Sequence, residues 1–268
     1  MAGFDTSFLS HATPLPGFTA DVAGDVRTVD RSTWLDYTHF SLSMSLERRL
    51  ARIVAWNIDG RALVPGETVP RSGVDFRLDP RVPADGQVGD ELYARNDLDR
   101  GHVARRADLL WGPDAARANE DSFFFTNITP QRSAFNQASR GGLWGRLEDD
   151  LLALATLDRA RIVVFGGPVL TDADPVYRGI GIPTAFWKAF VYEIDGAPRA
   201  QAFLLRQSLD GLGTGAFPDD EWRTYRLPFA RLVTATGVDL GAYASWERPA
   251  TPGAVGDRVP RPMERVVW

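Results

Sequence analysis

The order of strand-forming and helix-forming segments constrains the fold of this chain more than any other feature of its sequence. Residues 37–46 alternate with the period of two of a half-buried strand, and residues 52–58 follow as its partner strand, ending at the turn-forming pair Asp59-Gly60. The remaining expected elements are strands at 123–127 and 161–165, a hairpin of 186–194 with 199–205, and helices at 143–157 and 228–236. Because strands and helices do not alternate as in a parallel α/β fold, we predict an α+β fold with a central, largely antiparallel sheet flanked by helices.

The chain has 268 residues, a length that suits one sizeable domain. It contains no repeat, low-complexity tract or linker that would mark a second domain, so residues 1–268 are predicted to form one unit. Residues 1–30 are expected to be an extended N-terminal arm, and residues 250–268 a Pro-rich tail. Residues 60–92 are rich in Pro, Gly and Asp and predict long loops, which in compact domains usually carry function.

The composition excludes several classes of protein. The chain is 44% hydrophobic and 24% charged, which is ordinary for a globular domain, and no apolar run approaches a membrane span, so no membrane partner is expected. The first residues lack a basic region followed by an apolar one, so we predict no signal peptide and place the protein in the cytoplasm or on a non-classical export route. The absence of cysteine excludes thiolate catalysis and Cys-ligated metals.

The charge distribution gives two opposing indications about nucleic acid. A net charge of −5 argues against a nucleic-acid partner, because such binding usually leaves a basic footprint. Nearly all of the 30 basic residues are Arg, however, which favours bidentate phosphate contacts, and four of them cluster around His102: Arg95, Arg100, Arg105 and Arg106. The alternative explanation of the Arg content is a GC-rich genome.

One histidine stands in a distinctive pattern. The chain has three histidines, His11, His39 and His102, and the last of them ends an Asp-Arg-Gly-His motif at residues 99–102. An Asn-x-x-Pro-Gln at 127–131, an Asn-Gln at 136–137 and a Leu-Glu at 147–148 follow in order. Because a neutral imidazole can deprotonate a water molecule, His102 is the candidate general base. The alternative is a buried histidine satisfied by the backbone.

These four motifs in this order resemble the DNA/RNA non-specific endonucleases of the ββα-metal superfamily, which includes sugar-non-specific bacterial nucleases and mitochondrial endonuclease G. The similarity extends over roughly residues 5–240. It implies a Mg²⁺-dependent enzyme, with Mn²⁺ as the alternative metal, that hydrolyses DNA and RNA to 5′-phosphate and 3′-hydroxyl ends. It also implies a ββα-metal finger with His102 on its strand side and Asn136 on its helix.

The resemblance assigns three further residues to the metal site. Asn136 would be the direct protein ligand of the metal, with water and phosphate completing the shell; a helix cap or turn residue is its alternative role. Glu148 would hold a metal-bound water, although the twelve residues from Asn136 exceed the family's spacing, and a solvated helix face with Asp149 and Asp150 is the alternative. Asn127 would orient the water network, or else serve as a turn residue ahead of Pro130.

Arginines would bind the phosphate. Arg100 lies inside the motif, and Arg105 follows it. The family also uses an Arg upstream of the histidine, and both Arg71, 31 residues before His102, and Arg77, 25 before it, are candidates, with spacing favouring Arg71. Asp99 is expected to fix the motif's backbone or to pair with an Arg.

Two competing functions remain open at this stage. The displaced Glu148 and the acidic net charge favour a catalytically inert relative that binds nucleic acid without cleaving it. A phosphodiesterase for a smaller nucleotide substrate is the second alternative. A homodimer and an inhibitor protein are the further partners that the resemblance allows, an inhibitor because a non-specific nuclease endangers its host.

Overall fold

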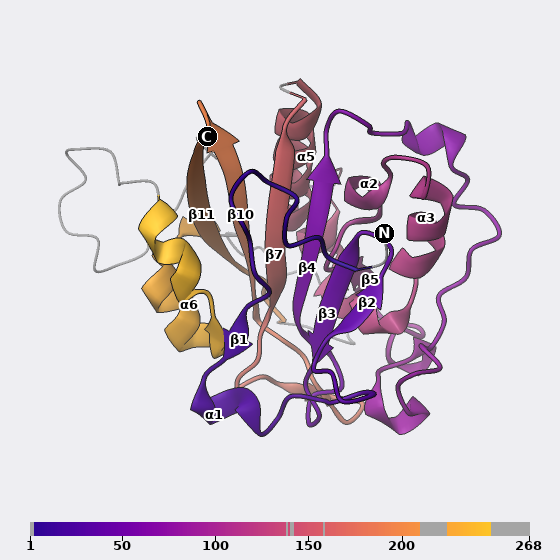
Figure 1. The fold of residues 1–268 in the computed structure, drawn as a ribbon. Helices are drawn as coiled ribbons and strands as arrows, with labels where there is room; N and C mark the ends of the chain where they lie inside the picture. Colours follow the sequence, from indigo (N-terminus) through magenta and orange to yellow (C-terminus); the bar gives the residue numbers. More distant parts are fainter. Residues whose placement is uncertain (1–2, 138, 140–141, 158, 210–223, 248–268) are drawn as a thin grey trace.

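A seven-stranded antiparallel sheet forms the centre of the computed structural model, which describes residues 3–137, 139, 142–157, 159–209 and 224–247 (Figure 1). Within these residues the strands follow the spatial order β12-β11-β10-β7-β4-β3-β2. In chain order they are β2 (Leu35–Tyr37), β3 (Phe40–Met44), β4 (Ala51–Asp59), β7 (Arg161–Val169), β10 (Ala185–Ile194), β11 (Ala197–Arg206) and β12 (Thr224–Arg226). Every neighbouring pair is antiparallel, which confirms the predicted α+β class.

Three two-stranded ribbons and six α-helices surround this sheet in the described residues. The ribbons pair β1 (Gly17–Phe18) with β13 (Val238–Asp239), β5 (Leu98–His102) with β6 (Ile128–Arg132), and β8 (Val176–Tyr177) with β9 (Ile180–Gly181). The helices are α1 (Ala20–Ala23), α2 (Arg106–Leu109), α3 (Ala115–Ser122), α4 (Ser133–Asn136), α5 (Leu143–Leu157) and α6 (Phe229–Thr236). Short 3₁₀ turns at Gly66–Thr68, Ala84–Gly86 and Asp90–Leu92 interrupt the predicted loops.

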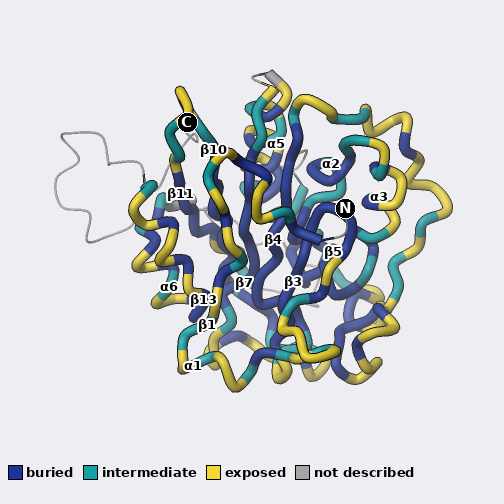
Figure 2. The backbone as a smooth tube through the Cα atoms, viewed as in Figure 1, coloured by how far each residue is buried: buried dark blue, intermediate teal, exposed yellow. Residues whose placement is uncertain are grey.

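Both faces of the sheet are covered, so its central strands are buried throughout (Figure 2). One face packs against α5, whose Trp144, Leu147 and Leu151 are buried at the positions expected for an amphipathic helix. The other face packs against α6 and the N-terminal segment, from which Phe4 and Phe8 are buried. A sheet covered in this way can support a site at the edge of one layer without movement of the layer beneath it.

The strand predicted at residues 37–46 is wrong in two respects. It is divided by a turn in which His39 has a φ of 71°, so β2 and β3 are separate strands. Its polar face is also buried, because the N-terminal segment lies on it and the Phe4 amide donates a 2.8 Å hydrogen bond to Ser41 Oγ. The strand β3 is therefore buried on both faces, although its alternating sequence is typical of a strand with one exposed face.

Two other strand predictions need a shift of bounds. Residues 123–127 do not form a strand: they lead through a 3₁₀ turn, Phe125–Asn127, into β6, which begins at Ile128. The strand predicted at 161–165 continues to Val169 as β7, because Gly167 lets the backbones pack closely: a Cβ at this position would lie 2.5 Å from the Arg52 carbonyl oxygen. Hydrophobic pattern alone does not register such local contacts.

The hairpin and both long helices are confirmed. The β10–β11 turn consists of Asp195 and Gly196, with φ values of 51° and 74°, as required for a tight hairpin turn. Gly237 ends α6 in the left-handed conformation, with a φ of 68°. In the described residues no helix has the length and apolar character needed to cross a membrane. The tail at 250–268 lies outside the described residues.

Phe186 on β10 provides a test of how the sheet supports the helices above it. Its ring is fully buried and packs against Phe135 of α4 and Trp144 of α5, with ring centroids 5.4 and 5.6 Å away. We expect Phe186→Ala to lower the free energy of unfolding by about 3–5 kcal/mol in urea denaturation. Ile194→Ala on the same strand, where the side chain is 49% exposed, should change it by less than about 0.5 kcal/mol. Equal effects of the two substitutions would contradict this packing.

Candidate active site

The β5–β6 ribbon places the motif residues relative to one another. In its antiparallel register Asp99 lies opposite Gln131 and His102 opposite Ile128. His102 is the last residue of β5, and α4 begins directly after β6, so Asn136 ends a short helix at the ribbon's far end. Two paired strands and a following helix, the arrangement that the resemblance implied, are therefore present, with His102 on a strand and Asn136 on the helix.

Asn127 is fully buried and fixes the chain beyond His102. Its Oδ1 accepts a 3.0 Å hydrogen bond from the Ala104 amide, and its Nδ2 donates to the carbonyl oxygens of Ala104 and Ser122 at 3.0 and 3.1 Å. All three partners are backbone groups. These bonds hold Asn127 at the 3₁₀ turn Phe125–Asn127, ahead of Pro130, and use both N–H groups of its amide.

The imidazole of His102 lies between aromatic rings and arginines. Its ring centroid is 5.3 Å from that of Phe123 and 5.7 Å from that of Phe76, and its Nε2 is buried with no hydrogen-bond partner among the described residues. No backbone group therefore satisfies this nitrogen in the described residues. Burial, and then the positive charges of Arg71, Arg106 and Arg105, lower the pKa of His102 to about 3. The imidazole is therefore neutral at pH 7 and has a lone pair to accept a proton.

Asp99 orients Asn136. One carboxylate oxygen, Asp99 Oδ2, accepts hydrogen bonds from Asn136 Nδ2 at 3.0 Å and from Gln137 Nε2 at 2.7 Å. The carboxylate thus holds Asn136 through its Nδ2, and the amide oxygen, Oδ1, is not the atom that Asp99 binds. Arg100 binds Asp90 rather than Asp99, so the role of Asp99 is to hold the amide, not to pair with an arginine.

The donor set fits a hydrated hard cation better than a closed metal cage. Among the residues that the structure describes, no group of three or more His, Asp or Glu side chains could hold a metal. A single amide oxygen suits Mg²⁺, because Mg²⁺ prefers oxygen ligands and keeps most of its bound waters. Both amide atoms of Gln131 are buried without partners in the described part of the chain, and such groups are normally satisfied by water.

Gln131 also explains the glycine of the motif. Its side chain lies directly over Gly101, where a Cβ would be 2.1 Å from Gln131 Oε1. The sequence placed Gln131 in a motif without giving it a role. Its buried, unpaired amide next to the His102 strand is the structural feature that singles it out.

Glu148 is buried rather than solvated. Its side chain is 7% exposed, its Oε1 accepts a 2.6 Å hydrogen bond from Lys188 Nζ, and its Oε2 lies 3.8 Å from Arg105 Nε. The alternative of a solvated helix face is wrong for Glu148 and right for Asp149, which is 53% exposed and pairs with Arg105 at 2.7 Å. Residues 138, 140 and 141 of the longer connection lie outside the described residues.

The candidate phosphate-binding arginines lie against different groups. The Arg71 guanidinium lies 5.6 Å from the ring centroid of Phe123, the ring that packs on His102, whereas Arg77 lies 4.1 Å from Phe124. Arg71 is also the largest charge acting on the pKa of His102. Arg105 is partly committed to Glu148 and Asp149. Arg100 is 33% exposed and paired with Asp90.

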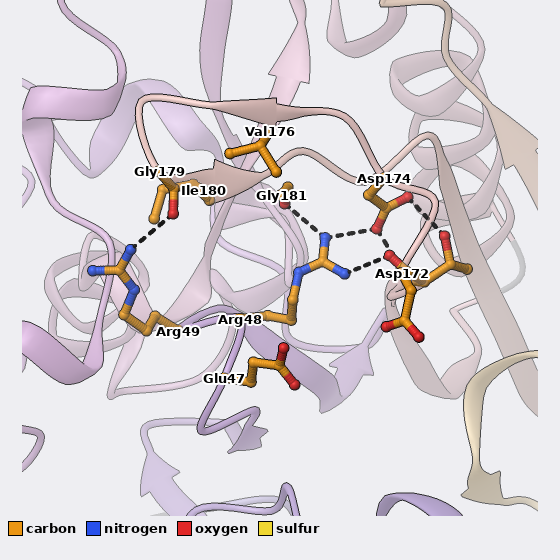
Figure 3. Close-up of a pocket in the computed structure, with 10 residues that line it drawn as sticks. Glu47, Arg48, Arg49, Asp172, Asp174, Val176, Gly179, Ile180 and Gly181 are labelled. Carbon is orange, nitrogen blue, oxygen red and sulfur yellow. Dashed lines mark hydrogen bonds and ion pairs between the residues drawn. The ribbon is translucent and has the colours of Figure 1, made fainter.

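A separate cavity of about 410 Å³ lies between residues 47–49 and the β8–β9 hairpin (Figure 3). Arg48 occupies its centre and donates to Asp174 Oδ2 and to the carbonyl oxygens of Thr171 and Gly181, at 2.6, 2.9 and 2.7 Å. The guanidinium therefore ties the hairpin to the β3–β4 turn. None of the motif residues lines this cavity.

A family model for the DNA/RNA non-specific endonucleases matches residues 23–245 of this chain. The chain belongs to this family. The resemblance deduced from the motifs is thereby confirmed, and an endonuclease is the class of enzyme that the family supports.

Individual proteins are also similar to this chain. The chain is 32% identical over 263 residues to protein y4fB of Sinorhizobium fredii, covering 88% of this chain and 38% of that protein. It is 31% identical over 185 residues to a nuclease of Serratia marcescens, covering 63% of this chain and 62% of the nuclease. A chain in the crystal structure of the EndoG/EndoGI complex matches 80% of this chain and 84% of its own length, with a TM-score of 0.59 and 19% identity, which supports the fold.

The two candidate upstream arginines can be separated by their effect on His102. Removing a nearby positive charge favours the imidazolium, so Arg71→Ala should raise the pKa of His102, while Arg77→Ala should leave it unchanged. We expect the wild-type imidazole to stay neutral from pH 8 to pH 5 in an NMR titration of ¹³C-labelled histidine, assigned with His102→Gln. A wild-type midpoint near 6.5, or equal shifts in both variants, would contradict the geometry.

Proposed function

We propose that this protein is a Mg²⁺-dependent, sugar-non-specific endonuclease that hydrolyses DNA and RNA to 5′-phosphate and 3′-hydroxyl ends. The observation that carries the proposal is the imidazole of His102, whose buried Nε2 has no hydrogen-bond partner among the described residues and whose pKa is lowered by burial and by the charges of Arg71, Arg106 and Arg105. A base without charge, next to cations that can hold a phosphate, is what attack of water on a phosphodiester requires.

His102 would accept the proton of the attacking water. Its low pKa makes it a weak base in the free protein, but a bound phosphodiester offsets the positive charges that depress this pKa. The basicity of His102 would therefore rise when substrate is present. Arg71 and Arg100, at the rim, and Arg105, deeper in, would contact the phosphate oxygens.

Asn136 Oδ1 would hold the Mg²⁺, with Asp99 fixing the amide, and Mn²⁺ would serve as a substitute. When bound, the metal would neutralise a non-bridging oxygen and stabilise the leaving 3′-oxygen. Glu148 would accept hydrogen bonds from the waters of this site. Gln131, whose side-chain amide has no partner among the described residues, would both accept hydrogen bonds from these waters and donate to them.

Glu148 favours an enzyme over an inert relative. Despite its longer spacing from Asn136, its carboxylate lies beside Arg105, one of the guanidiniums that act on His102. No base-reading motif is present, in agreement with contacts to the backbone only. By analogy with EndoG, which is found in complex with EndoGI, we also propose that an inhibitor protein restrains this activity; a homodimer remains a prediction.

Digestion of supercoiled plasmid and of single-stranded RNA tests the function. We expect both to be degraded with Mg²⁺, neither with EDTA, and the new 5′ ends to accept label only after phosphatase treatment. Asn136→Ala should raise the Mg²⁺ concentration needed for half-maximal rate about 10- to 100-fold.

Three results would overturn parts of this proposal. Binding of DNA without metal-dependent cleavage would indicate the inert relative. Rapid cleavage of a small phosphodiester, with plasmid and RNA left uncleaved, would indicate a phosphodiesterase for a smaller nucleotide substrate. A single cleavage sequence in the plasmid would refute non-specificity.

A further inference from the structure

Lys188 is the only lysine in a chain that has 29 arginines. It lies on β10, its side chain is fully buried, and it contacts Glu148 across the layer between sheet and α5. We propose that Lys188 is a positioning residue for catalysis, which holds one oxygen of Glu148 so that the other faces the site. This inference rests on the proposed nuclease function and assigns it a residue outside all four motifs.

The position of the ammonium group is tightly defined. Lys188 Nζ donates to Glu148 Oε1 at 2.6 Å and lies 4.2 Å from the ring centroid of Trp144 and 5.0 Å from that of Trp56. Gly166 on β7 leaves room for this group, since a Cβ there would be 3.2 Å from Trp56 and 3.4 Å from the lysine stem. Two aromatic faces and one carboxylate therefore fix the cation.

The ammonium lies among several charged groups. Trp56 Nε1 donates to Asp108 Oδ2 at 3.1 Å, and Asp108 is fully buried, so two buried carboxylates, Asp108 and Glu148, lie near Lys188 and Arg105. Removal of Lys188 would leave these two carboxylates with Arg105 alone, which already pairs with Asp149. The carboxylate of Glu148 would then be free to rotate and to form a direct pair with Arg105 through both oxygens, so that neither oxygen stays fixed for the waters of the site.

The choice of lysine over arginine has a geometric reason. A guanidinium forks across both oxygens of a carboxylate, whereas an ammonium makes a point contact with one. Here Oε1 is bound by Lys188, and Oε2 lies 3.8 Å from Arg105 Nε, beyond hydrogen-bond distance. Oε2 is therefore available to accept a hydrogen bond from a water molecule of the active site, and Lys188→Arg would engage both oxygens instead.

A double-mutant cycle on plasmid cleavage tests this role. We expect Lys188→Met to lower kcat about 10- to 100-fold with little change in KM. In the Glu148→Gln background the same substitution should change kcat by less than about twofold, because the residue it positions is already lost. The proposal would be overturned if the double variant lost kcat by the product of the two single-variant factors. It would also be overturned if Lys188→Met raised KM and left kcat unchanged.

The single lysine also supplies a probe that does not depend on Lys188→Met folding. Protein labelled with [ε-¹³C]lysine gives one assigned NMR signal, and we expect it to shift in Glu148→Gln and, in wild type, on addition of Mg²⁺ with a non-hydrolysable phosphorothioate oligonucleotide. If the chemical shift of this signal changed in neither case, Lys188 would have a structural role only. An inactive wild type would refute the proposed function instead, while activity lost in Glu148→Gln but retained in Lys188→Met would refute this inference alone.

Discussion

The pairing of β5 with β6 is the constraint on which the candidate site depends. A two-stranded ribbon has little stability of its own, so its geometry must come from its surroundings. Leu98 and Ile128 anchor it in an apolar cluster with Leu92 and Tyr93, and Asn127 binds the backbone just beyond its end. The ribbon then delivers His102 at one terminus and, through α4, Asn136 at the other.

Local electrostatics, rather than net charge, distinguish this site. The chain carries a net charge of −5, yet three guanidiniums act on His102, and the buried ammonium of Lys188 holds Glu148. Several arginines elsewhere are paired with nearby carboxylates, such as Arg48 with Asp174 and Arg81 with Asp79. Under the proposed function, the substrate would be held at the scissile phosphate, and the acidic net charge would keep the general affinity for polyanions low and help product release.

The motifs located the candidate site better than they predicted its surroundings. His102 and Asn136 could be proposed as site residues from the sequence, because each sits within a short contiguous motif. Lys188 and Asp108 could not, because their proximity to Glu148 is created by the packing of β10 and α2 against α5. The strand expected at 123–127 failed for a related reason: Asn127 is bound to Ala104, 23 residues earlier, and this long-range contact ends the turn where a strand pattern was expected to run.

The most direct test of the central claim is the rate of Mg²⁺-dependent plasmid cleavage by His102→Ala, compared with His11→Ala, whose imidazole lies at the surface beside Glu193. If His102 is the general base, its substitution should lower kcat by about 10²- to 10⁴-fold at pH 7, while His11→Ala should cleave like wild type. Cleavage by His102→Ala at the wild-type rate would contradict the account and move the search for the base away from the end of β5.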